Sequence, residues 1–240
     1  MMPRGNIQHR ENFLNHIAEQ SGRPRSQHVE RPAWKQQPQW QVFKHESSDK
    51  WVERFKKQCE HIHTDVIETE TAGVGETVAE TIGRYQAASL MMWEDPRLEE
   101  AGLNKHFREQ MANLGVETHI WDKSKGRENI NIAEQTHVGI TYSDITLAES
   151  GTVVLFSSAD KGRAVSLLPE TYIAIIPQSS IVPRMSQATQ QIHQRVQNGE
   201  TIPSCINFIS GPSNSADIEM SLVVGVHGPV KATYILINDQ

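Results

Sequence analysis

A chain of 240 residues and 27.1 kDa is long enough to bury a substantial core within one α/β domain. Its formal net charge of -6, with 37% hydrophobic and 22% charged residues, argues against a general nucleic-acid-binding surface. No apolar run approaches the roughly 18 residues that a membrane span needs, and the first residues lack the apolar core of a signal peptide. We therefore expect a cytoplasmic protein without a membrane span.

The first 45 residues differ in composition from the rest of the chain. They hold seven Lys or Arg against three Glu, with many Gln and Pro, and a single helical run near residues 7–19. We therefore predict a basic N-terminal arm with one helix over residues 1–45 and an α/β domain over residues 46–240. A solvated arm laid on its own domain and an arm packed on a partner subunit both fit this composition.

From residue 49 onward, amphipathic runs of helical length alternate with short apolar runs, a pattern typical of a mostly parallel sheet. Helices are predicted at residues 51–62, 76–85, 104–114 and 184–197, and Gly115 is predicted to end the third of them. Strands are predicted at residues 66–70, 89–93, 116–121, 137–141, 151–156, 172–176, 205–209 and 233–237. This order of elements predicts an α/β fold with three layers, α/β/α, around a mostly parallel sheet.

Ligands for metals and redox centres are few. Cys59 and Cys205 are the only cysteines, and two thiolates fall short of the four that an ordinary iron-sulfur cluster uses. His61 and His63 have donor atoms suited to a divalent cation, but their spacing crosses a predicted helix boundary and favours solvated histidines. We expect no cofactor and no metal in this chain, and any electrons from an oxidation to be carried by other proteins.

The first candidate site is the motif Ala148-Glu-Ser-Gly-Thr152, which directly precedes an apolar run. Glu149 and Ser150, next to Gly151, could bind a hydroxylated substrate, and Glu149 could act as a base or attack an acyl group. The same residues also fit a purely structural turn, in which Gly151 takes a positive φ. Arg163 could hold a substrate carboxylate in a bidentate manner or pair with an acidic residue on the surface.

The second candidate site combines two glycine-containing turns, at residues 211–219 and 225–229. A helix predicted to begin at residues 213–216 would favour an anion, although the acidic residues behind it would repel a phosphate. His227 is the side chain here whose charge changes near neutral pH. The substrate-binding candidates in these turns are Gly211, Ser213, Ser215, Asp217, Glu219, His227 and Gly228. The catalytic candidates are Glu149, Asp217 and His227.

These motifs, together with Gly162-Arg163 and Leu168-Pro169, resemble those of the lactate utilization protein C family, whose members carry a LUD domain. The resemblance implies a fold similar to the NagB/RpiA/CoA-transferase group. It also implies a role in oxidising L-lactate to pyruvate, needed for growth on lactate, with two companion proteins that carry iron-sulfur clusters. A small organic acid, L-lactate or pyruvate, is the implied ligand. Ser215 stands where family members typically have Thr, which keeps the hydroxyl.

Three functions remain open at this point, and with them the question whether the chain is itself an enzyme. The first is a subunit of a lactate-oxidising system without its own redox cofactor. The second is an independent acyl- or CoA-transferase that uses Glu149, by analogy with the glutamate nucleophile of CoA-transferases. The third is a regulatory protein that binds a carboxylate through Arg163 and the two glycine-containing turns.

Overall fold

The computed structural model describes residues 7–26, 28, 30, 34–216 and 220–239, which fall into two compact units. The first unit, Met1–Gln41, contains α1 (Arg10–Gln20) and the short 3-10 helix η1 (Pro38–Trp40). The helix predicted near residues 7–19 is confirmed by α1. None of its residues is buried, and Glu11 accepts hydrogen bonds from Arg10 and Arg25. Polar contacts therefore contribute to the order of this unit.

The second unit, Val42–Gln240, is built on a six-stranded sheet in which every neighbouring pair is parallel. In spatial order the strands are β1 (Thr64–Glu70), β12 (Lys231–Asn238), β7 (Thr171–Pro177), β4 (Val138–Tyr142), β2 (Ser89–Met92) and β3 (Glu117–Ile120). All seven residues of β7 are buried, as expected for a central strand that is covered on both faces. The predicted α/β fold with a mostly parallel sheet is confirmed.

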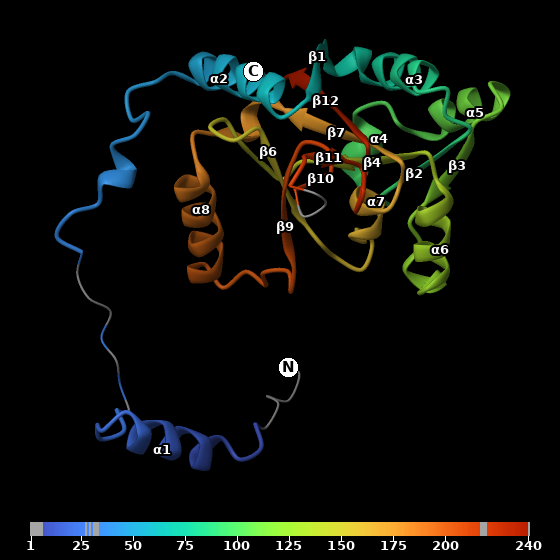
Figure 1. Cartoon of the computed structure of the whole chain (residues 1–240). Helices are drawn as coiled ribbons and strands as arrows, with labels where there is room; N and C mark the ends of the chain where they lie inside the picture. The colour runs from blue at the N-terminus through green and yellow to red at the C-terminus, as the bar shows by residue number, and fades with distance from the viewer. Residues whose placement is uncertain (1–6, 27, 29, 31–33, 217–219, 240) are drawn as a thin grey trace. The chain divides into compact units, whose positions relative to one another are not determined.

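Helices flank this sheet, with α2 and α3 on one side in Figure 1 and α6 and α7 on the other. The α-helices of this unit are α2 (Ser48–His61), α3 (Val74–Arg84), α4 (Pro96–Glu100), α5 (Lys105–Asn113), α6 (Glu128–Gln135), α7 (Ala164–Leu167) and α8 (Met185–Gln197). The 3-10 helices are η2 (Thr71–Gly73), η3 (Lys123–Lys125) and η4 (Gln178–Ser180). Asn104 caps α5 by accepting hydrogen bonds from two backbone amides, and Gly115 follows the helix with φ +78°, as predicted.

A second, four-stranded sheet is a feature that the sequence pattern did not predict. Its order is β8 (Ile181–Val182), β5 (Ile145–Leu147), β6 (Thr152–Phe156) and β9 (Ile206–Ser210). The strands predicted at residues 151–156 and 205–209 therefore exist, but they pair with each other in antiparallel fashion outside the main sheet. Gly151 has φ +60°, the positive angle expected for it, and lies in the turn that reverses the chain between β5 and β6.

The core of the second unit lies between the main sheet and its covering elements. Phe55 of α2 stacks on Tyr234 of β12 with ring centroids 5.8 Å apart, and both side chains are fully buried. A smaller apolar cluster, which includes Phe156 and Ala188, joins the second sheet to α8. Within the described residues, no helix is both long and apolar enough to cross a membrane.

Candidate functional site

The two glycine-containing turns of the sequence lie against each other. The Ser213 amide donates a hydrogen bond to the Pro229 carbonyl at 2.8 Å, and the Gly225 amide donates to the Ser213 carbonyl at 2.9 Å. A Cβ at Gly228 would lie 3.3 Å from the Cβ of Ser213 and from the Leu167 carbonyl oxygen, so this close approach favours glycine. Segments 211–213 and 225–229 therefore form one structural unit.

Between these turns, β9 and α7 lies a cavity of about 300 Å³, which we call the glycine-turn pocket. Its lining consists of Ser166, Leu167, Tyr172, Phe208, Ile209, Ser210, Gly211, Pro212, Ser213, Asn214, His227, Gly228 and Pro229. The polar side chains of this lining are hydroxyls, one amide and one imidazole, and none is a carboxylate. His227 is exposed and makes no hydrogen bond to the described residues. As far as the described residues show, the pocket therefore offers donors to a small anion without a competing acidic group.

Gly211 is fixed in place by the buried side chain of Tyr234. Its amide donates to the Tyr234 hydroxyl at 2.9 Å, and its φ of +67° is accessible to glycine at little cost. A Cβ at this position would lie 2.7 Å from the Ile62 carbonyl oxygen. Burial raises the pKa of Tyr234 well above its usual value, so the phenol stays neutral and serves to position the turn.

A chain of hydroxyl groups connects the first motif to this pocket. Ser150 and Thr152 share a hydrogen bond of 2.6 Å between their Oγ and Oγ1 atoms, and Thr152 and Ser210 share another of 2.6 Å. Thr152 is paired with Ser210 in the register of β6 and β9, which explains why the two motifs meet. Ser210 lines the glycine-turn pocket, so the hydroxyl chain runs from the Ser150 turn to the pocket wall.

Glu149 and Arg163 lie outside the pocket lining. The Glu149 carboxylate accepts a hydrogen bond of 2.7 Å from Arg184 Nε and is 40% exposed. Arg163 is exposed, and its guanidinium lies 3.8 Å from the Cys205 Sγ atom, before the start of β9. Among the described residues, neither side chain lines the cavity that the two turns form.

The helix predicted to begin at residues 213–216 is wrong. Asn214 and Ser215 form β10 (Asn214–Ser215), which pairs with β11 (Val223–Val224) in an antiparallel hairpin. The chain continues as an extended strand here because main-chain groups of both turns bond across to each other rather than along a helix. Ser215 is buried within this hairpin. The candidates Asp217 and Glu219 lie outside the described residues.

The structure adds a group of charged residues that the sequence motifs missed. In the main sheet β3 lies on one side of β2, and the later strands β4, β7 and β12 lie on the other side. The strand order therefore reverses between β2 and β4. In open α/β sheets, ligands bind beyond the carboxyl ends of the strands at such a point. Asp95 follows β2 and Asp144 follows β4, and a carboxylate after each of two neighbouring strands is the signal that could have revealed them.

These two carboxylates share two cations in what we call the strand-end ion cluster, formed by Asp95, Arg97, Asp144 and Lys161. Arg97 donates to Asp95 at 2.6 Å through Nη2 and to Asp144 at 2.9 Å through Nη1. Lys161 Nζ lies 3.9 Å from Asp95 and 3.7 Å from Asp144. Burial raises the pKa of Asp95, but the hydrogen bonds and charge of Arg97 outweigh it, and the net pKa is lowered. The cluster ties the residues after β6 to the ends of β2 and β4.

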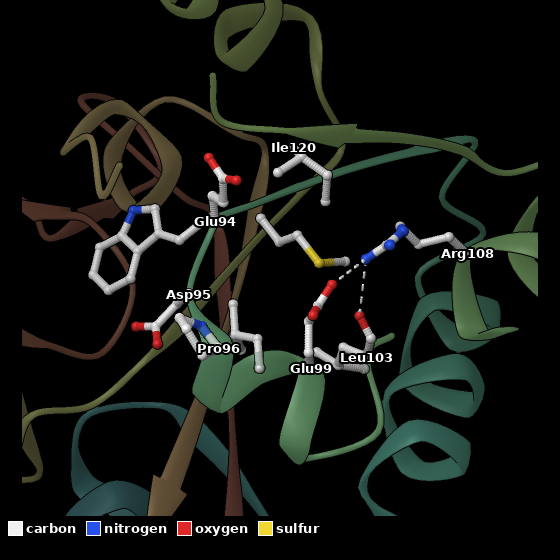
Figure 2. A pocket seen from close by; sticks show the side chains of 10 residues that line it. Glu94, Asp95, Pro96, Glu99, Leu103, Arg108 and Ile120 are labelled. Carbon is white, nitrogen blue, oxygen red and sulfur yellow. Dashed lines mark hydrogen bonds and ion pairs between the residues drawn. The ribbon is translucent and has the colours of Figure 1, made fainter. Parts of the chain in front are cut away.

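A second cavity, of about 360 Å³, has Asp95 in its lining and lies at the carboxyl ends of β2 and β3; we call it the β2–β3 cavity. Figure 2 shows its lining, with Glu94 and Arg108 at opposite ends and Ile120 between them. Arg108, from α5, lies 3.3 Å from Glu99 Oε1 and 3.5 Å from the Leu103 carbonyl oxygen. The described residues contain no group of three or more His, Cys, Asp or Glu arranged to hold a metal ion.

The two cysteines are expected to differ in reactivity. Cys59 is fully buried, and burial raises the pKa of its thiol to about 12, so little reactive thiolate forms at neutral pH. Cys205 is partly exposed. Iodoacetamide should therefore add a single group to the native protein, at Cys205, and modify Cys59 only after denaturation, as measured by intact mass. Cys205→Ser should abolish the native reaction, and native labelling of Cys59 would contradict the described packing.

The fold and these strand-end sites define an α/β protein with a parallel main sheet. A solved structure of a DUF162 family protein from Deinococcus radiodurans is similar, with a TM-score of 0.55 and 16% identity over 80% of this chain and 99% of that chain. This similarity extends to the fold alone.

The LUD domain family model matches residues 52–237, and the chain belongs to this family. Among curated relatives, a protein of Geobacillus sp. (strain WCH70) named Lactate utilization protein C is 55% identical over 241 residues, with both chains fully covered. A protein of the same name from Bacillus subtilis (strain 168) is 54% identical over 240 residues, again with full coverage of both chains. The similarity therefore includes the segment before the LUD domain.

Proposed function

We propose that this chain is a component of a lactate utilization system that oxidises L-lactate to pyruvate. The observation that carries the proposal is the 55% and 54% identity, over the full chain, to relatives named Lactate utilization protein C. Because the alignments cover both chains completely, they support the same role and the same assembly for this chain. The acyl-transfer alternative gains no support from the position of Glu149, which is paired with Arg184 and lies outside the glycine-turn pocket.

In this proposal the glycine-turn pocket binds the organic acid, L-lactate or pyruvate. The carboxylate of the ligand would accept hydrogen bonds from the hydroxyls of Ser210 and Ser213 and from the ring of His227. A protonated imidazole adds charge to such a hydrogen bond, which makes it stronger than a neutral one. The aromatic side chain of Phe208 would face the methyl group of the acid.

The electrons of the oxidation pass, in this proposal, to iron-sulfur clusters held by two partner proteins. The chain itself supplies two cysteines, whereas an ordinary cluster uses four thiolates. One of the two, Cys59, is fully buried beside the Gly151 turn. The role of this chain would then be to bind the acid and to complete the oxidising assembly.

Growth on L-lactate as sole carbon source tests the role. A deletion strain should fail to grow, and the wild-type chain should restore growth. His227→Gln should restore growth poorly, because the pocket loses its imidazole, whereas His193→Gln, at an exposed position of α8, should restore it fully. Lactate-dependent dye reduction in extracts should follow the same order.

Normal growth and normal dye reduction in the deletion strain would contradict the proposed role. If the deletion strain fails to grow but His227→Gln restores growth fully, the role is upheld and His227 does not bind the acid. The two outcomes therefore separate the role of the chain from the location of its ligand.

A further inference from the structure

The β2–β3 cavity has the position of a ligand site in an open α/β sheet. Met92 and Ile120 end two adjacent parallel strands, and residues that follow β2 form part of the wall. The cavity lies at the carboxyl ends of these two strands, on the β3 side of β2, next to the reversal of strand order between β2 and β4. Its volume of about 360 Å³ is within the range of small-molecule pockets. The proposed function assigns no ligand to this cavity.

The middle of this cavity is apolar. The side chains of Met92, Leu98 and Leu103 back its wall and are at most 1% exposed, so the apolar surface open to a ligand comes from Ile120 and Pro96. Ile120 completes this wall in Figure 2. A surface of this kind favours the hydrocarbon part of a ligand over a second polar group.

The two ends of the cavity carry opposite charges. Arg108 supplies a guanidinium at one end, and its side chain is 28% exposed. Its carboxylate partner, Glu99, is 61% exposed and 3.3 Å away, which is a long contact that a competing anion can replace. At the other end Glu94 is exposed and accepts no hydrogen bond from the described residues.

We propose that the β2–β3 cavity binds an ω-amino carboxylate, a small molecule with an ammonium and a carboxylate at the two ends of an apolar chain. The carboxylate pairs with Arg108 in place of Glu99, the ammonium pairs with Glu94, and the methylene chain covers Ile120 and Pro96. A simple anion would leave its other end against the exposed carboxylate of Glu94. A simple amine would leave Arg108 paired only with Glu99.

Calorimetric titration of the full chain with 6-aminohexanoate, hexanoate and hexylamine tests this proposal. The zwitterion should bind, and each compound with a single charge should bind about tenfold or more weakly, the ratio expected for one lost charge-assisted hydrogen bond. A series from 4-aminobutanoate to 8-aminooctanoate should show one preferred chain length, because Arg108 lies on α5 and Glu94 lies in the segment between β2 and α4. Equal binding of hexanoate and 6-aminohexanoate, or no binding of either, would overturn the proposal.

Charge-removing variants locate the two ends of the ligand. Arg108→Met should weaken 6-aminohexanoate about tenfold or more and leave hexylamine unchanged, whereas Glu94→Gln should weaken 6-aminohexanoate and leave hexanoate unchanged. Arg127→Met and Glu117→Gln, both exposed and outside the cavity lining, should leave every affinity unchanged. If the Arg108→Met variant unfolds at a lower temperature, Arg108→Lys, which keeps the charge, replaces it in the titrations. Unaltered affinity for 6-aminohexanoate in both cavity variants would contradict the site, whatever the outcome of the growth experiment.

Discussion

Asp95→Asn is expected to lower the free energy of unfolding at pH 7 by about 3 kcal/mol, the cost of breaking a buried ion pair. Asp95 is 7% exposed and accepts three hydrogen bonds from the Arg97 side chain, to its two oxygens at 2.6 to 3.2 Å. It also accepts one from the Arg97 amide as the N-terminal cap of α4. The neutral amide keeps the shape of the carboxylate but leaves Arg97, among the described residues, with Asp144 as its close carboxylate. Urea unfolding of both proteins measures the difference.

The effect of Asp95→Asn should depend on pH in a defined direction. The pKa of Asp95 is lowered in the folded protein relative to its ordinary value. Its ionised form therefore contributes stability that is complete above the unfolded pKa of about 3.9 and is lost as the pH falls through the lower, folded pKa. The difference between wild type and variant should be constant from pH 7 to about pH 5 and should shrink below about pH 4. Glu117→Gln, at an exposed carboxylate on β3, should change stability by about 0.5 kcal/mol or less. A difference for Asp95→Asn that grows on acidification would contradict this account.

Gly139→Ala is expected to destabilise the fold by about 3 kcal/mol or more, as overpacking does at a site that cannot relax. Gly139 lies in β4, a central strand, and a Cβ there would meet the Val165 carbonyl oxygen of α7 at 1.9 Å and Pro169 Cγ at 2.9 Å. Main-chain atoms of α7 would have to move, and with them Ser166 and Leu167 in the wall of the glycine-turn pocket. Thermal and urea unfolding measure the loss.

Gly83→Ala is the matched control for that substitution, with the opposite expected sign. Gly83 is an exposed residue within α3, and a Cβ there would meet no atom within 4 Å. Alanine should therefore stabilise the helix by about 0.5 to 1 kcal/mol relative to glycine. Similar destabilisation by both changes would show that the approach of α7 to β4 is not what restricts Gly139.

The main sheet was predictable from the sequence because its inner strands are short apolar runs and helices of amphipathic pattern separate most of its strands. The second sheet was not, since β5 and β8 have three and two residues and a strand of that length carries no periodicity. The strands β6 and β9 were predicted, but an apolar run does not reveal whether its partner is parallel or antiparallel. Tertiary pairing, which local patterns do not contain, determines that assignment.

At the candidate sites the sequence was informative where a residue type has a specific conformational need. Gly151 and Gly211 were recognised as turn residues, and both have positive φ. The hydrogen bond between Thr152 and Ser210 depends on the register of β6 with β9 and could not be read from spacing. Arg108 and Glu94 were missed for a related reason, because they come from separate segments of the chain and no motif of fixed spacing joins them.

The pairing of the first and last strands of the main sheet has a consequence for synthesis of the chain. Thr64 of β1 pairs with Ala232 of β12, and the side chains of Glu70 and Asn238 hydrogen-bond across 168 positions. During translation, β1 and β7 lack the neighbour that joins them until β12 has left the ribosome. Nascent chains stopped before residue 231 would therefore present two unpaired strand edges, which are targets for chaperones and starting points for aggregation.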